Sequence, residues 1–453
     1  MTNYSHKYFI YTLIGFVLLC LVSYMAQAQA PSSPRRLSLR EAVTLAIQNN
    51  RDIKVSAISI ERSQQQTRIA RSLYLPTISA NAQVAHYFSQ PVFFGFGQEQ
   101  SDGKIPYGRF GGNDQALAAL NIIQPLYAPS AKAENIRSKL VEKESSLALS
   151  NKETEVAAYV KLLYLQILVL NERIHLQKES LGRNMKALQD AKSLLAQGRA
   201  LRVDTLRAYT SVKNLEPELL QLSNAIEVNT LQLRRQIGID SLENFVLTDS
   251  LILPDADQNI PTEDEVFNEA KSKRGDIQAI ALQPSIKEQE MTIAKAGKRP
   301  TVSLAGQYLI QTQASQMNYF NAYYPSTTFI GAQVSVPIFS GNSNNAKVQQ
   351  ASLAQKQAVL QTENAYLQLR TEVKQVVSGL NETIARLQTR TTVKETAQMS
   401  YDITQYRYAK GVASRLELTD AELALSTAQS NYLEAVYDYL SARIALARTT
   451  GRQ

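Results

Sequence analysis

Leu75-Pro76-Thr77-Ile78-Ser79-Ala80 returns 224 residues later as Arg299-Pro300-Thr301-Val302-Ser303-Leu304. In both stretches the proline follows a helix-type pattern and precedes an alternating, strand-type pattern, because proline cannot continue the helix before it. The same helix-to-strand transition therefore occurs twice in one chain. This repetition decides the fold.

Further matches keep the same order along the chain, and together they indicate two copies of one unit over 37–238 and 261–451. A segment over 239–260 links the copies. The matches are Asn50-Arg51-Asp52-Ile53 with Arg274-Gly275-Asp276-Ile277, Ile123-Gln124-Pro125-Leu126-Tyr127 with Ser335-Val336-Pro337-Ile338-Phe339, and Gly198 with Gly411.

Each copy is expected to begin with one helix of about 35 residues that ends at the proline. A serine or threonine followed three residues later by glutamate forms the capping box that opens a helix. The two pairs are Ser38 with Glu41 and Thr262 with Glu265.

Two strand-type runs follow each proline and predict β-hairpins over 77–127 and 301–339. The runs have the length of a tilted membrane strand, about 9–11 residues. Taken alone, such runs are better explained by ordinary surface hairpins. The aromatic loops over 91–96 and 319–324 are expected at an outer rim, where Tyr and Phe suit a membrane interface.

Long helices come next, over 130–197 and 343–410, and neither contains proline. At 1.5 Å per residue each is about 100 Å long, too long for a compact domain, so we expect coiled-coil rods. Val160, Leu163 and Ile167 begin a heptad pattern. Glycine then turns each chain back, which predicts helical hairpins over 130–238 and 343–449, the first bent at Pro217.

The first 30 residues are expected to be a signal peptide. Residues 9–22 are almost all apolar, and Ala26-Gln27-Ala28 offers a cleavage site of small residues. An apolar core of about 14 residues is short for a membrane-spanning helix, which needs about 20. The single cysteine, Cys20, lies within this core, so the exported chain, which we begin at residue 31, contains none.

Composition excludes several functions. The 48 lysines and arginines are interspersed with 40 acidic residues, so we expect no nucleic-acid partner. No cysteine remains for a zinc cluster, and His86 and His175 have no partner at ligand spacing. We therefore expect no metal, no cofactor and no catalytic residues, that is, no enzyme.

The two hairpin tips share a pattern of glycine, an acidic residue six positions later and alanine ten positions later. With the tandem repeat and the Gln-Pro-Leu-Tyr and Val-Pro-Ile-Phe strand ends, this pattern resembles the outer-membrane efflux protein family, the TolC-like exit ducts. The tips read Gly198-Arg199-Ala200-Leu201-Arg202-Val203-Asp204-Thr205-Leu206-Arg207-Ala208 and Gly411-Val412-Ala413-Ser414-Arg415-Leu416-Glu417-Leu418-Thr419-Asp420-Ala421.

The resemblance implies an α+β, mostly α, fold in a homotrimer. Three chains, with four strands each, would form a 12-stranded β-barrel in lipid of the Gram-negative outer membrane. Their coiled-coil helices would form an α-barrel in the periplasm, with 239–260 in an equatorial band. A periplasmic adaptor would dock at the tips and connect an inner-membrane transporter of the RND, ABC or MFS type.

The resemblance also assigns roles at the tips. The residues expected to form the pore constriction are Glu417, Asp420 and Asp204. Those expected to dock the adaptor at the periplasmic tip are Gly198, Gly411, Arg199 and Val412. Those expected to hold neighbouring hairpins together in the closed state, as a closed-state latch, are Tyr408, Asp204 and Arg415. The family tends to place an arginine where this chain has Ala413, and Arg415 from the same turn is expected to replace it.

Two simpler explanations stay open. Acids in the first turn of a helix, such as Glu417, can merely complement the helix dipole. A soluble periplasmic coiled-coil adaptor would account for the export signal and the rods, but it would not require two matched strand pairs. A secreted hydrolase lacks a nucleophile and base pair.

Overall fold

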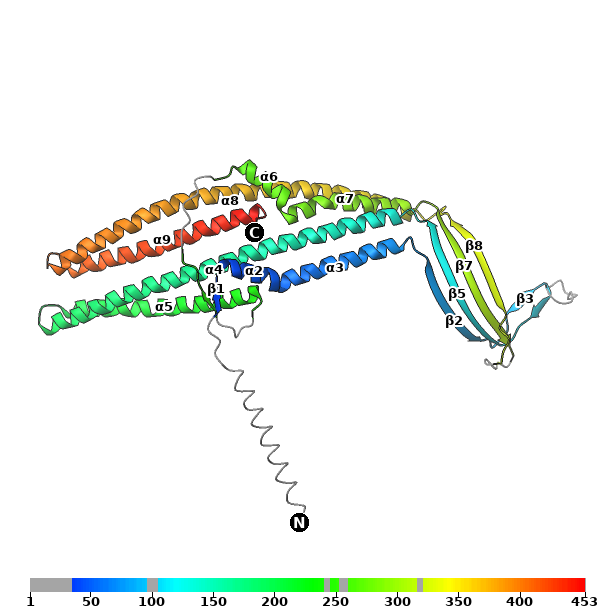
Figure 1. Cartoon of the computed structure of the whole chain (residues 1–453), viewed down its shortest axis with the longest axis horizontal. Helices are drawn as coiled ribbons and strands as arrows, with labels where there is room; N and C mark the ends of the chain where they lie inside the picture. The colour runs from blue at the N-terminus through cyan, green and yellow to red at the C-terminus, as the bar shows by residue number, and fades with distance from the viewer. Residues whose placement is uncertain (1–34, 96–104, 240–244, 252–259, 316–320, 453) are drawn as a thin grey trace, which may run out of the picture.

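The computed structural model describes residues 35–95, 105–239, 245–251, 260–315 and 321–452. Two long helical hairpins run side by side, their tips lie at one end, and a four-stranded sheet stands at the other (Figure 1). The expected signal peptide, 1–30, lies outside the described residues, and so does part of the 239–260 linker. The fold expected from the sequence, mostly α with a small sheet, is confirmed.

The hairpins are α4 (Ala131–Ala196) with α5 (Arg202–Ile237), and α8 (Ser343–Ala409) with α9 (Arg415–Thr449). The long helices α4 and α8 begin and end within one residue of the bounds that the sequence indicated. Helix α4 also packs along α9, so the two hairpins of one chain touch. Pro217 lies inside α5, which continues through it.

The expectation of one 35-residue helix before each proline was wrong. The first copy has α2 (Leu39–Asn49) and α3 (Arg51–Ser72), and the second has α6 (Glu263–Lys273) and α7 (Gly275–Ala296). Asn50 leaves the helical region at ψ 131°, and its Oδ1 accepts hydrogen bonds from the backbone of Asp52 and Ile53. An asparagine that caps the next helix ends the previous one.

Arg274 occupies the matching break in the second copy. Its guanidinium donates to Asp276 and, at 2.7 Å, to Glu372 on α8. The capping boxes also differ between copies. Thr262 and Glu265 form the complete box, whereas the Glu41 carboxylate accepts from Arg35 at 2.8 Å, so at Ser38 only the hydroxyl half of the expected box is formed.

A short parallel pair ties the linker to the first copy. Strand β1 (Arg35–Leu37) pairs with β6 (Phe245–Leu247), and Leu37 is fully buried beside Val160 on α4. The Tyr164 hydroxyl lies 2.9 Å from both Leu37 O and the Asp249 carboxylate. Burial and the hydrogen bond to Asp249 raise the pKa of Tyr164 to about 12.

The sheet contains β2 (Thr77–His86), β5 (Asp114–Tyr127), β7 (Thr301–Ala314) and β8 (Ser326–Ser335), in the antiparallel order β2-β5-β7-β8. The two predicted hairpins thus join edge to edge through β5 and β7. Within the described chain, β2 and β8 each pair along one side only. Nearly every residue of these two strands is exposed, so neither face of the sheet is covered.

The strand register sorts side chains onto two different faces. One, the apolar face, carries Ile78, Ala80, Ala82 and Val84 of β2, and Ala118, Leu120, Ile122, Leu304, Tyr308, Ile310, Ile330 and Val334 of its neighbours. The other, the amide face, carries Asn81, Gln83, Asn121, Gln307, Gln311 and Gln333, together with the apolar Leu117, Ile123, Leu309 and Phe329. Hydrogen bonds link Gln307 to Asn121 and Asn121 to Asn81, at 2.8 and 2.7 Å.

Beyond the sheet, the first aromatic loop forms a small hairpin that the sequence did not predict. Strand β3 (Val92–Phe94) pairs with β4 (Tyr107–Arg109) at the far end of the molecule (Figure 1). Phe96 of this loop and residues 319–320 of the second aromatic loop lie outside the described residues.

Candidate functional site at the hairpin tips

The two tips are built by the same backbone turn. Gly198 and Gly411 adopt φ of +70° and +74°, the left-handed region that glycine enters at little cost. The next backbone N–H closes each turn: Arg199 N donates to Leu194 O at 2.8 Å, and Val412 N donates to Arg407 O at 2.9 Å. This is the Schellman arrangement that ends a helix. The prediction that glycine turns the chain back at both tips is confirmed.

Asp204 lies in the first turn of α5. Its carboxylate accepts a hydrogen bond from Leu201 N at 3.2 Å, which satisfies one backbone donor at the start of the helix. Within the described part of the chain, Asp204 makes no hydrogen bond to Tyr408. One chain therefore does not join these two predicted latch residues.

Ser414 and Glu417 form a complete capping box at the start of α9. The Ser414 hydroxyl accepts from Glu417 N at 3.2 Å, and the Glu417 carboxylate accepts from Ser414 N at 3.3 Å. These bonds from Ser414, with the positive charge of Arg407 at 3.8 Å, lower the pKa of Glu417. Glu417 is thus an anion already engaged by its own helix terminus, as the simpler explanation expected.

Tyr408 and Arg415 do come together. The guanidinium carbon of Arg415 lies 5.8 Å from the centre of the Tyr408 ring, within the range of a cation–π contact. Tyr408 also packs beside buried Leu418 and Leu425. Ala413, where the family tends to have arginine, is buried beneath the turn.

The other predicted tip residues face solvent. Arg199, Val412 and Asp420 are exposed, and Val412 is 69% accessible. Among the described residues, no hydrogen bond or ion pair engages the Asp420 carboxylate. Of the predicted acids, Asp420 alone thus has a carboxylate free for a passing ion.

A polar cluster that the sequence reading missed joins the two hairpins. Glu422 on α9 is buried, and its Oε1 accepts from Asn184 at 3.0 Å and Arg183 Nε at 3.3 Å, both on α4. Arg183 also lies over the Tyr401 ring of α8. Burial, followed by the negative charge of Glu422, raises the pKa of Tyr401.

A signal for this cluster was present in the sequence. Glu422 lies between Leu418 and Leu425 at spacings of four and three residues, on the stripe that α9 buries. An acid on a buried stripe needs a partner, because burying an unpaired charge is costly. The partner lies 238 or 239 residues away in sequence, so it was not readable from local spacing.

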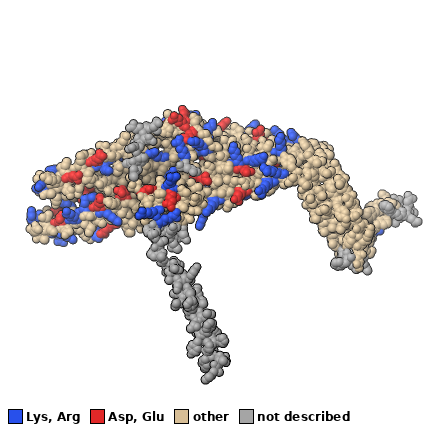
Figure 2. Space-filling model, in the orientation of Figure 1, with Lys and Arg blue, Asp and Glu red and all other residues tan. Residues whose placement is uncertain are grey.

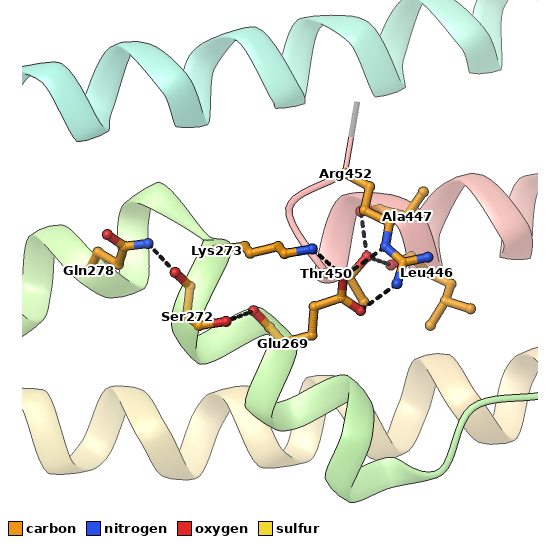
Figure 3. Close-up of polar contacts among 8 residues, drawn as sticks. All are labelled: Glu269, Ser272, Lys273, Gln278, Leu446, Ala447, Thr450 and Arg452. Atoms are coloured by element: carbon orange, nitrogen blue, oxygen red, sulfur yellow. Dashed lines mark hydrogen bonds and ion pairs between the residues drawn. The ribbon is translucent and has the colours of Figure 1, made fainter.

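The far end of α9 is fixed to the second copy's short helix. Arg452 donates two hydrogen bonds to Glu269 of α6, at 2.8 and 2.7 Å, and Lys273 donates a third (Figure 3). Hydrogen bonds from Arg452, and to a lesser extent from Lys273, lower the pKa of Glu269. Away from the tips, the end of α9 is thus held to α6 by charge-assisted hydrogen bonds.

Among the described residues, no helix combines the length and the hydropathy that crossing a membrane requires. A family model described as "Outer membrane efflux protein" matches two segments of the chain, 42–239 and 266–452. These segments make up most of its length.

Individual relatives are distant but cover nearly the whole chain. The alkaline protease secretion protein AprF of Pseudomonas aeruginosa is 20% identical, over 90% of this chain and 82% of its own. The toluene efflux pump outer membrane protein TtgC of Pseudomonas putida is 21% identical, over 91% and 83%.

Solved structures agree on the fold. The Campylobacter jejuni CmeC outer membrane channel superposes with a TM-score of 0.77 at 17% identity, over 91% of this chain and 85% of that one. The relatives are channel proteins of the outer membrane, which rejects the soluble adaptor as an explanation. The chain belongs to the outer membrane efflux protein family and is an exit duct of the outer membrane.

Proposed function

We propose that three copies of the chain close one 12-stranded barrel and one continuous duct, through which cargo leaves the periplasm. The observation that carries this proposal is the uncovered sheet. Four strands are too few to close on themselves, and both β2 and β8 have an unpaired edge in the described chain. Pairing β2 of one copy with β8 of the next removes all edges, and three copies give an even strand number within the range of outer-membrane barrels.

The two faces of the sheet fit this arrangement. The apolar face would contact lipid and the amide face would line the lumen, since membrane barrels alternate in this way. A ten-residue strand is about 33 Å long and, when tilted, spans about 25 Å of apolar membrane. Asn81, Asn121 and Gln307 would then form a hydrogen-bonded, uncharged band around the lumen.

The duct would pass cargo chemically unchanged between a periplasmic adaptor with its inner-membrane transporter and the outside. The names of the relatives differ widely in cargo, from an alkaline protease to toluene. A pathway shared by such different cargo supports selection by the pump and not by the duct. The exposed tip residues Gly198, Arg199, Gly411 and Val412 are the proposed docking surface for the adaptor.

Two further roles are proposed at the tips of the trimer. Asp420, Glu417 and Asp204 would face the narrow end of the duct, where threefold symmetry turns each into a ring of carboxylates that favours cations. Tyr408, Asp204 and Arg415 would hold neighbouring hairpins in the closed state. Because Asp204 and Tyr408 do not bond within one described chain, this contact would form between copies or after a shift of the hairpins.

The test is the particle itself. The mature protein in detergent should have the mass of three chains by light scattering, and electron microscopy should show a threefold tube with a helical section about 100 Å long. In planar bilayers it should conduct ions. A monomer, or a particle without threefold symmetry, would contradict the proposal.

A further inference from the structure

The ends of the helices that meet the sheet are strongly basic. Nine lysines and arginines and one acid, Glu134, lie within 68–75, 128–140, 294–301 and 340–350. In the adjoining turns, 61–67, 141–147, 286–293 and 351–357, four bases are balanced by five acids. We name the nine the basic collar: Arg68, Arg71, Lys132, Arg137, Lys139, Lys295, Lys298, Arg299 and Lys347.

Figure 2 shows these blue side chains gathered where the helical part joins the sheet, while the sheet itself is almost entirely tan. Strands β2, β5, β7 and β8 contain no lysine, arginine or glutamate, and Asp114 at the far end of β5 is their only aspartate. Positive charge therefore stops abruptly at the start of the strands.

The collar is not neutralised within the chain. Glu134 pairs with Arg137 at 2.5 Å. The other eight side chains are exposed, and none has a carboxylate at ion-pair distance among the described residues. Charges that build an internal network would be paired, so this arrangement points to a partner outside the chain.

The position of the collar identifies that partner. Between it and the strands lie exposed apolar and aromatic side chains of the kind that mark a membrane surface, among them Tyr74, Tyr127 and Phe339. Phe339 is 88% accessible in the single chain. The collar follows immediately on the helical side, which in the barrel proposed above is the depth of the lipid headgroups. At the other end of the strands, the described residues 87–95 and 105–115 contain only two charged side chains, Arg109 and Asp114.

We propose that the basic collar binds anionic phospholipid headgroups in the periplasmic leaflet of the outer membrane. A leaflet that contains anionic lipid has a negative surface potential, which attracts lysine and arginine placed at the surface and fades within a Debye length, about 8–10 Å. The collar supplies a multivalent contact around the circumference of the duct. Such a contact fixes the depth of the strands in the bilayer independently of the tips and of any adaptor.

The test uses the full mature protein reconstituted into phosphatidylcholine vesicles that contain a minor fraction of spin-labelled lipid. Protein-restricted label should be at least about threefold more abundant for phosphatidylglycerol than for phosphatidylcholine, and 0.5 M salt should abolish the difference, as expected of surface charge. The variant K132Q/K139Q/K347Q should lose most of this preference. The matched control K178Q/K186Q/K192Q removes three exposed lysines of α4 far from the membrane and should keep it.

Three results would overturn the proposal: no preference in the unmodified protein, an equal preference in the collar variant, or a preference that survives high salt. Both variants should elute as the same assembly as the parent, which separates lipid binding from misfolding. Should the collar variant lose binding to isolated peptidoglycan and keep its lipid preference, the collar recognises the cell wall and the lipid proposal is wrong. The measurement needs neither adaptor nor cargo, so it can fail while the duct function stands.

Discussion

Glu422 of α9 accepts a hydrogen bond from the side-chain amide of Asn184 on α4 at 3.0 Å, and this contact joins the two helical hairpins about 20 Å from their tips. Arg183, the preceding residue of α4, donates to the same carboxylate oxygen at 3.3 Å and brings a positive charge to it. The tips of one chain are therefore coupled through a buried polar cluster and not only through apolar packing.

Replacing Glu422 with alanine should destabilise the hairpin pair. Removing one partner of a buried ion pair leaves the other charge unpaired, and since Arg183 keeps some contact with water we expect a loss of about 2–3 kcal/mol. Thermal unfolding of the detergent-solubilised protein measures it. Asp420→Asn, on an exposed acid two residues away, should change the free energy of unfolding by less than about 0.5 kcal/mol. Equal effects of the two substitutions would show that the cluster does not hold the hairpins.

Alanine at either tip glycine should cost about 1 kcal/mol, because a Cβ is strained at φ near +70°. No atom lies within 4 Å of the added Cβ at Gly198 or Gly411, so the cost comes from the backbone alone. Gly182 offers the matched control, since its Cβ also meets open space but its backbone is helical. Gly182→Ala should stabilise the protein by about 0.5–1 kcal/mol. A stabilising effect at all three positions would refute the role of the turn.

Cation selectivity should depend more on Asp420 than on Glu417. The Glu417 carboxylate is held by Ser414, whereas within the described chain Asp420 engages no partner. Asp420→Asn should therefore shift the reversal potential in a potassium chloride gradient more than Glu417→Gln does. Asp264→Asn, on exposed α6 far from the tips, serves as the control and should leave the potential unchanged. A larger shift from Glu417→Gln would assign the constriction to the capping residue instead.

The contribution of Arg452 to the free energy of unfolding should decrease in acid. Hydrogen bonds from Arg452 and Lys273 lower the pKa of Glu269 below its ordinary value of 4.5, so the unfolded state binds more protons in this range. The stabilisation is complete at neutral pH and is lost as the pH falls through the lowered pKa. Arg452→Ala should reduce the free energy of unfolding by up to about 1 kcal/mol at pH 7, as for an exposed pair, and by progressively less as the pH falls below 4.5 through the lowered pKa. A difference that does not shrink as the pH falls would exclude the carboxylate as its source.

The sequence predicted the elements whose signals are long or repeated. Absence of proline and a sustained heptad pattern set the bounds of α4 and α8, and the repeated proline set the start of β2 and β7. The break at Asn50 had a local signal that was not used, an asparagine able to cap the helix that follows it. The break at Arg274 was missed because its guanidinium is held in part by Glu372 of α8. Local pattern cannot report a contact made across more than 90 residues.

At the tips, too, the sequence predicted the features that have a local signal. The glycine turns and the position of the acids followed from the tip sequences. That Glu417 caps its own helix depends on which of the two acids, Glu417 or Asp420, has a serine three residues before it, and Ser414 was available to be noticed. Of the Glu422 cluster, the acid on the buried stripe could be read from the sequence, but its partner could not, because only the packing of α4 against α9 brings Asn184 to it.

The unpaired edges of β2 and β8 impose an order on the protein's biogenesis. The helical rods bury apolar cores within one chain, so they can fold as soon as the chain is exported. The outer strands β2 and β8 stay almost entirely exposed until neighbours and lipid arrive. If three chains must associate, the concentration of the closed barrel rises with the third power of the concentration of free chains. A single chain meanwhile exposes two unpaired strand edges, which can pair with other proteins. Quality control of this duct would therefore act on the interval between export and assembly.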